Sequence, residues 1–151
     1  MKLGKVLKQS GYRQDLILAA EMISVPWYAS VDELIRGLEK NAFAGVEYNP
    51  FVVVVGTTSV VLFNVGPFIG AVAASGLSQL LFAIAALLWL YCCWQSCWNL
   101  RVPRWYSLGF PLAALLLVYI QWRTMLLNYW LGGIRWRDTL YPLDQLRANR
   151  V

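Results

Sequence analysis

Residues 51–100 read FVVVVGTTSVVLFNVGPFIGAVAASGLSQLLFAIAALLWLYCCWQSCWNL and contain no Asp, Glu, Lys or Arg. This charge-free tract is bounded by Glu47 and Arg101 and so extends over 53 residues. The hydrocarbon core of a bilayer is about 30 Å thick, and a helix of about 20 apolar residues crosses it. The tract therefore predicts two membrane-spanning helices that are joined at the polar SGLSQ segment.

A second charge-free tract of 18 residues separates Arg104 from Arg123 and predicts a third span. Across the chain, 59% of the residues are hydrophobic and 14% are charged, whereas a soluble domain carries about 25% charge. We therefore expect a mostly α-helical integral membrane protein with about three transmembrane helices. The expected spans, within a transmembrane region of residues 48–131, are 51–73, 80–98 and 108–127.

The segment before the spans, residues 1–47, has a different character. Its first 13 residues predict a short helix that Gly11 ends, and LILAAEMISVPWY (16–28) predicts an extended segment. An amphipathic helix follows over 30–45, because Ser30 and Glu33 have the spacing of a capping box and the apolar residues recur at helical intervals. Two interpretations of this helix stay open: it lies in the membrane interface, or it packs on a soluble domain.

Two further expectations concern the spans. Pro67 lacks a backbone N–H and is expected to kink the first span, and Arg123 has a stem long enough to reach the interface from the third.

The positive-inside rule places residues 1–47, Arg101 and Arg104 in the cytoplasm. Three crossings would then export the basic tail, residues 132–151. Either the third apolar segment re-enters the membrane or the tail is external, and we favour three crossings.

Charge and chemistry exclude several classes. Residues 1–47 contain six basic and six acidic side chains, so the net charge of +5 lies beside the apolar spans and does not indicate nucleic-acid binding. The chain has no His, and Cys92, Cys93 and Cys97 fit no zinc pattern. We interpret these thiols as small hydrophobic side chains. The residues alone indicate a membrane anchor with a small amphipathic cytoplasmic part.

Three stretches around the spans add a resemblance. MKLGKVLKQSGYRQDL (1–16), WYASVDELIRGLEKNAFAG (27–45) and GIRWRDTLYPLDQLR (133–147), in this order, resemble the C-terminal part of membrane-bound family 2 glycosyltransferases of the ceramide and hopanoid type. The resemblance implies that residues 1–47 are a remnant of an α/β, GT-A-like catalytic domain plus an interfacial helix. The donor-binding domain, its acidic metal-binding motif and the base would precede this chain, which would then be a fragment that is inactive alone.

The resemblance also implies candidate site residues. Many such enzymes carry Gln-x-x-Arg-Trp on the interfacial helix, and that element is missing here. Cations and amides suit a diphosphate, so the candidates for substrate or interface contacts are Trp27, Tyr28, Arg36, Lys40 and Asn41. The alternative for these residues is a solvated helix face. The candidates for a headgroup-level anchor in the tail are Arg135, Trp136, Arg137 and Tyr141, followed by a short helix begun by Pro142.

The resemblance implies that the parent enzyme moves a sugar from a nucleotide-sugar donor to a lipid acceptor, using a divalent metal. This chain would hold no catalytic residue, metal ligand or cofactor of its own. Its expected partners are the lipid bilayer, the lipid acceptor and the missing catalytic domain, with no nucleic acid, and its expected location is the plasma (inner) membrane with residues 1–47 cytoplasmic. The alternative function is a small non-enzymatic membrane anchor or assembly subunit. A transporter piece is a weaker alternative, since only Arg123 approaches an intramembrane charge.

Overall fold

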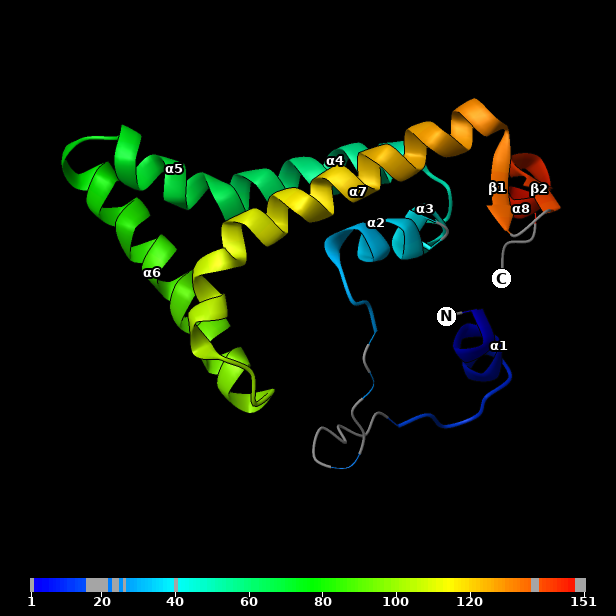
Figure 1. Cartoon of the computed structure of the whole chain (residues 1–151), viewed down its shortest axis with the longest axis horizontal. Coiled ribbons are helices and arrows are strands. Elements are labelled where there is room, and N and C mark those ends of the chain that lie inside the picture. Colours follow the sequence, from blue (N-terminus) through cyan, green and yellow to red (C-terminus); the bar gives the residue numbers. More distant parts are fainter. Residues whose placement is uncertain are drawn as a thin grey trace.

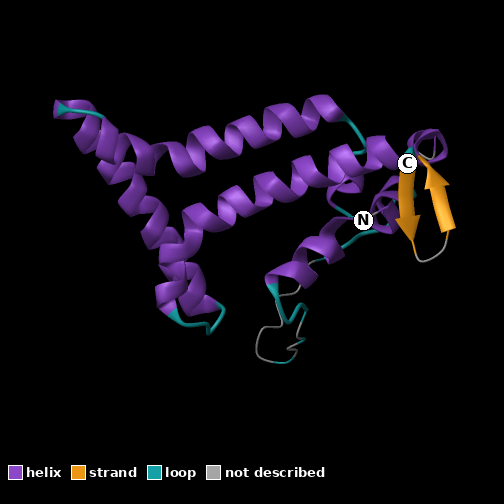
Figure 2. Ribbon diagram, turned by 45° about the horizontal axis from the view of Figure 1, so that its top comes forward, coloured by secondary structure: helices purple, strands orange, loops and turns teal. Residues whose placement is uncertain are grey.

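The computed structural model describes residues 2–15, 22, 25, 27–39, 41–136 and 139–148. The described chain is mostly helical, with one two-stranded antiparallel sheet near its C-terminus (Figures 1 and 2). Two helical segments, η1 and η2, are a π-helix and a 3-10 helix. The elements in chain order are α1 (Lys2–Gln9), α2 (Val31–Glu39), α3 (Ala42–Gly45), α4 (Pro50–Val60), η1 (Val61–Val65), α5 (Gly66–Ala73), α6 (Gly76–Asn99), η2 (Arg104–Gly109), α7 (Phe110–Leu131), β1 (Gly133–Trp136), β2 (Thr139–Pro142) and α8 (Leu143–Ala148).

The N-terminal helix α1 ends as the sequence predicts. Gly11 adopts a left-handed conformation with φ +81°. The N–H groups of Gly11 and Tyr12 donate to the carbonyls of Lys8 and Leu7, both at 3.1 Å. These two bonds form a Schellman motif, which satisfies carbonyls that a helix end would otherwise leave unpaired. The predicted extended segment, residues 16–28, lies largely outside the described residues.

The predicted amphipathic helix is divided into two short helices. A variant of the capping box forms at its start. The Glu33 N–H donates to Ser30 Oγ at 3.2 Å, and the Glu33 carboxylate accepts from the N–H of Ala29, one residue before the N-cap, at 2.9 Å. The helix does not continue to Gly45. The Asn41 N–H donates to the Leu38 carbonyl at 2.9 Å, and this tight turn ends α2 and redirects the chain into α3.

Three helices are long and apolar enough to cross a membrane, in agreement with the prediction: Pro50–Ala73, Gly76–Asn99 and Arg104–Leu131. The first of them is built from α4, η1 and α5, and the third from η2 and α7. In Figure 1, α7 lies beside α4 along much of its length. Trp122 of α7 donates its indole N–H to Thr57 Oγ1 at 3.1 Å, and Thr57 donates to the Val53 carbonyl at 2.7 Å.

At Pro67, where we expected a kink, the structure places the π-helical segment η1 directly before the proline. Because Pro67 has no N–H, the carbonyl of Phe63, four residues earlier, loses its usual helical donor. Trp89 of α6 takes that role, since its indole N–H donates to the Phe63 carbonyl at 2.9 Å. Neighbouring helices satisfy proline-freed carbonyls in this way within membranes. The Trp89 ring also stacks on Phe110, with ring centroids 5.0 Å apart.

Helix α6 approaches α5 closely and then diverges. At Gly70, a Cβ atom would collide with the Phe82 ring, so glycine allows the close crossing of these two helices. Figures 1 and 2 both show α6 leaving α5 and α7 at a steep angle, with η2 folded back against its last turns. We call α6 together with η2 the α6–η2 hairpin.

The opposite end of α4 and α7 carries a compact hydrophobic cluster, which we call the terminal core. Its centre is Phe43, whose side chain is fully buried. Segments that are distant in sequence contribute to it: α3, the start of α4, the end of α7, β1 and α8. The buried members are Phe43, Tyr48, Val53, Met125 and Leu143, and Ala44, Val46, Ile134 and Leu146 pack around them.

The sheet beside the terminal core was not predicted. Gly132 ends α7 in a left-handed conformation with φ +69°, and β1 then pairs with β2 so that Ile134 lies opposite Tyr141. Helix α8 begins at Leu143, directly after Pro142, close to where the sequence places it. The Leu143 N–H donates to the Gly132 carbonyl at 2.9 Å, which fixes α8 at the end of α7.

Candidate functional site

The first group of candidate residues lies around α2. Trp27 is exposed and its ring stacks on Tyr28, with centroids 5.7 Å apart. The Tyr28 ring lies against the backbone of Gly37, where a Cβ atom would overlap it. The two aromatic rings are therefore held against α2 because residue 37 has no side chain.

The polar candidates of this group are on or just after α2. Arg36 is exposed in the last turn of the helix. Asn41 is exposed and precedes α3, without a side-chain hydrogen bond to that helix. Lys40 lies outside the described residues. The structure thus places Tyr28, Arg36 and Asn41 on neighbouring turns, and their role as phosphate or acceptor ligands stays a prediction.

The second group of candidates is in the tail. Tyr141 lies in β2 and is partly exposed. In the β1–β2 register, Arg135 is opposite Leu140 and Trp136 is opposite Thr139. The side chains of Arg135 and Trp136, and the whole of Arg137, lie outside the described part of the chain. Arg135, Trp136 and Tyr141 therefore belong to a β-hairpin that packs on the terminal core.

Arg147, which the sequence interpretation did not single out, ties the tail to the N-terminal segment. Its Nη2 donates to the Tyr129 hydroxyl at 2.8 Å and to the Tyr48 carbonyl at 3.3 Å. Its guanidinium also lies 5.6 Å from the centre of the Tyr129 ring. Arg147 was predicted only as part of a short helix, because its partners are 18 and 99 residues away in sequence.

Tyr48 contributes a buried ring to the same place. It packs edge-on against Phe43, with ring centroids 5.6 Å apart, and burial raises the pKa of its phenol above the ordinary value of 10.0. A raised pKa favours the protonated form in the folded state. The contribution of Tyr48 to stability is therefore present below pH 10 and is lost as the pH rises above it.

Arg123 does not reach the interface unaccompanied, because it forms an ion pair with Glu39. Its Nε lies 2.6 Å from Glu39 Oε1, with side-chain exposures of 40% for Arg123 and 28% for Glu39. The pair joins the last residue of α2 to α7 and brings α2 alongside it (Figure 1). The amphipathic helix is thus packed on a membrane-grade helix of its own chain, and none of its described residues is fully buried.

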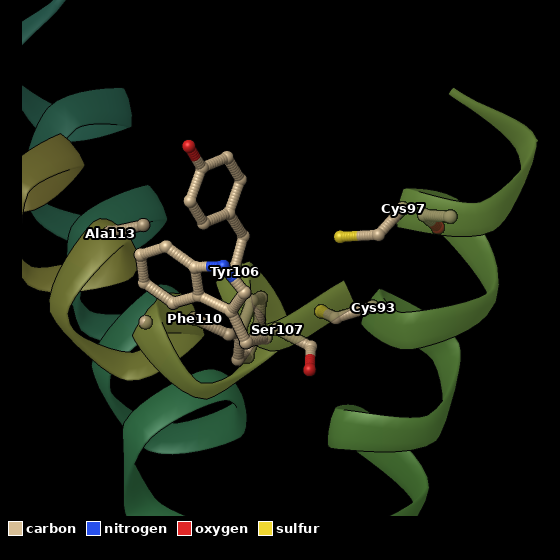
Figure 3. Close-up of a pocket in the computed structure, with 9 residues that line it drawn as sticks. Cys93, Cys97, Tyr106, Ser107, Phe110 and Ala113 are labelled. Carbon is tan, nitrogen blue, oxygen red and sulfur yellow. The ribbon is translucent and has the colours of Figure 1, made fainter. Parts of the chain in front are cut away.

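A shallow apolar hollow of about 420 Å³ lies inside the α6–η2 hairpin (Figure 3). Cys93 and Cys97 face it from α6, opposite Tyr106 and Phe110. The three cysteines are free thiols. Among the residues that the structure describes, no group of three or more His, Cys, Asp or Glu side chains is placed to hold a metal.

Comparison with known proteins adds no identification. No protein-family model, curated protein or solved structure matches the chain. The function therefore has to be argued from the residues and their geometry.

Proposed function

We propose that this chain is an integral membrane protein that serves as the lipid-side part of a family 2 glycosyltransferase. In this role it holds a catalytic domain at the cytoplasmic face of the plasma (inner) membrane. A lipid acceptor reaches a water-soluble nucleotide-sugar only at that boundary, so an anchor with a rigid surface at one end of its helices suits the reaction. The three long apolar helices support membrane insertion.

The observation that carries the proposal is the terminal core. The sequence stretches 27–45 and 133–147, which bear the resemblance to these enzymes, lie on opposite sides of the spans in sequence. In the structure, Phe43 from the first stretch packs with Leu143 from the second, and Arg147 reaches the carbonyl of Tyr48. The two stretches therefore form one unit at one end of α4 and α7, which is where a catalytic domain would be seated.

A reconstitution experiment tests this function. The reading frame upstream of Met1 is expressed with and without this chain, and membranes are assayed for sugar transfer from a nucleotide-sugar to lipid. We expect transfer to require the chain. We expect Arg36→Ala to lower transfer at equal protein level, whereas Lys8→Ala on α1 serves as the matched control. An upstream frame unrelated to nucleotide-sugars, or full transfer without this chain, would contradict the proposal.

The second candidate function is a non-enzymatic anchor or assembly subunit. It is supported by the three long apolar helices, which serve an anchor as well as they serve a lipid-side enzyme domain. Transcription that starts directly before Met1, with no sugar-transferring frame beside it, would favour this alternative.

A further inference from the structure

We propose that the α6–η2 hairpin enters and leaves the bilayer on one face, so that the chain crosses the membrane twice. The tip of the hairpin would lie among the lipid headgroups of the leaflet opposite the terminal core. This inference rests on the membrane insertion proposed above, but it does not depend on the sugar-transfer function. It replaces the expectation of three crossings and an external tail.

The first step is that both ends of the apolar region lie on one side. The terminal core joins Phe43 and Tyr48, which precede the first span, to Leu143, which follows the third. Arg147 adds a hydrogen bond to the Tyr48 carbonyl. Residues that pack together must lie on the same side of the membrane, even when they come from opposite ends of the apolar region in sequence. The number of crossings between them is therefore even.

The second step is that α7 runs antiparallel to the first span over most of its length. Phe110, at the start of α7, lies beside Phe68 in the first turn of α5, with ring centroids 6.3 Å apart. Trp122, further along α7, bonds Thr57 near the start of the first span. The first span therefore crosses in one direction, and α7 returns across the same depth of the bilayer.

The third step concerns what lies between these two helices. Helix α6 begins at Gly76, on the far face. Helix α7 begins beside Phe68, which lies five residues before the end of α5 and so toward that same face. The link from the tip back to α7 is η2, whose six residues rise about 2.0 Å each in a 3-10 helix and so span about 12 Å. That length is well below the roughly 30 Å of the hydrocarbon core. Since η2 folds back along α6 (Figure 1), it joins the tip to the start of α7 within this distance, and the tip stays near the far face.

The surface of the hairpin tip fits lipid headgroups. The Arg104 guanidinium lies 3.7 Å from the centre of the Trp98 ring and 5.6 Å from that of Trp94. Trp105 follows and is 68% exposed. Indole rings concentrate at headgroup depth, and a guanidinium stacked on an indole face keeps its edge N–H groups for phosphate. We therefore assign the occupant of this surface as the phospholipid headgroups of the far leaflet.

The charge distribution assigns the terminal core to the cytoplasm. Under the positive-inside rule, Lys and Arg near the ends of spans collect on the cytoplasmic side. The far face has two such residues, Arg101 and Arg104. In the sequence, the segments before the first span and after the third contain six, namely Arg36, Lys40, Arg135, Arg137, Arg147 and Arg150. With two crossings, the basic tail no longer conflicts with this rule.

Cysteine labelling tests the topology in the full chain. The native thiols are first replaced in a Cys92→Ala, Cys93→Ala, Cys97→Ala background. Single cysteines are then introduced, and intact or permeabilised spheroplasts are treated with a membrane-impermeant maleimide. We expect Ser75→Cys and Val102→Cys to be labelled in intact cells. We expect Asp32→Cys and Asp144→Cys to be labelled only after permeabilisation.

Leu88→Cys is the matched control for lipid contact on α6. Leu88 is 59% exposed in the structure, yet acyl chains would cover it, so we expect much slower labelling there than at Val102. The proposal is overturned if Val102→Cys shares a side with Asp32→Cys, if Asp144→Cys lies opposite Asp32→Cys, or if Leu88→Cys reacts as fast as Val102→Cys. Alkaline carbonate extraction separates this failure from failure of membrane insertion, because a peripheral chain would be released into the supernatant.

Discussion

The terminal core and the α6–η2 hairpin are stabilised in different ways. The terminal core draws side chains from five segments around Phe43, and most of its contacts join residues far apart in sequence. The hairpin is attached at its base by the Trp89 hydrogen bond and by ring stacking on Phe110. Helix α6 as a whole is nearly bare, since 6% of its apolar window is buried, against 22% for each of the other two long helices.

The difference in burial indicates which surroundings, water or lipid, suit each region. A water-facing unit must bury its apolar side chains against protein, since exposure costs about 25 cal/mol per Å². A helix in lipid has no such requirement, because acyl chains are as apolar as leucine. In a membrane protein, the bare α6 would be stable among the acyl chains, and the packed terminal core would be stable at the aqueous edge.

The largest expected effect tests the terminal core. Phe43→Ala removes a fully buried ring and should cost about 3–5 kcal/mol of local stability. Trypsin cleavage after Arg147 in detergent micelles measures this loss as faster release of residues 148–151. Phe51→Ala, at a position 72% exposed on α4, is the matched control and should leave the cleavage rate unchanged. Equal effects of the two variants would show that the terminal core is not a packed unit.

A smaller effect tests the base of the hairpin. Trp89→Phe keeps an aromatic ring beside Phe110 but removes the N–H that bonds the Phe63 carbonyl. Hydrogen bonds between membrane helices contribute about 0.6 kcal/mol on average and up to about 1.7, so we expect a loss in that range on unfolding in mixed micelles.

Pro67→Ala sharpens this test, because alanine restores a backbone N–H at residue 67 that can donate to the Phe63 carbonyl. In the Pro67→Ala background, Trp89→Phe should cost less than in the native chain. Equal costs in both backgrounds would mean that Trp89 acts through its ring alone.

The smallest effect concerns the contact between α2 and α7. Glu39 and Arg123 are partly exposed, and such pairs contribute about 0.2–1 kcal/mol. A double-mutant cycle with Glu39→Gln and Arg123→Gln, read as protection of α2 from hydrogen exchange, should give a coupling in this range that decreases with salt. If no coupling is measured at low ionic strength, the Glu39–Arg123 ion pair does not link α2 to α7.

The sequence predicted the local features of the fold and missed the long-range ones. Charge-free tracts located the three long helices, and the positions of Ser30, Glu33 and Gly11 predicted local caps. Hydropathy carries no information on which helix a given face meets, so the Trp89 bond to residue 63 was not predicted. The strands β1 and β2 have four residues each, too few for an alternation pattern to be recognised.

The same limit applies to the candidate site. Arg36 and Asn41 were chosen because they lie where the resembling enzymes carry Gln-x-x-Arg-Trp and because their chemistry suits a diphosphate, and the structure leaves both exposed. Glu39 was not among the candidates, although it forms the ion pair with Arg123 of α7. Its partner is 84 residues away, and a pattern within one helix cannot reveal such a pair.

That separation of 84 residues between Glu39 and Arg123 also has a consequence for biosynthesis. A ribosome that adds about 5–20 residues per second makes Arg123 about 4–17 s after Glu39. During this interval, α2 has left the ribosome while the helix that binds it does not yet exist. Helix α2 therefore docks only once the last apolar helix has been translated, and a chaperone or the translocation machinery has several seconds in which to engage its amphipathic face.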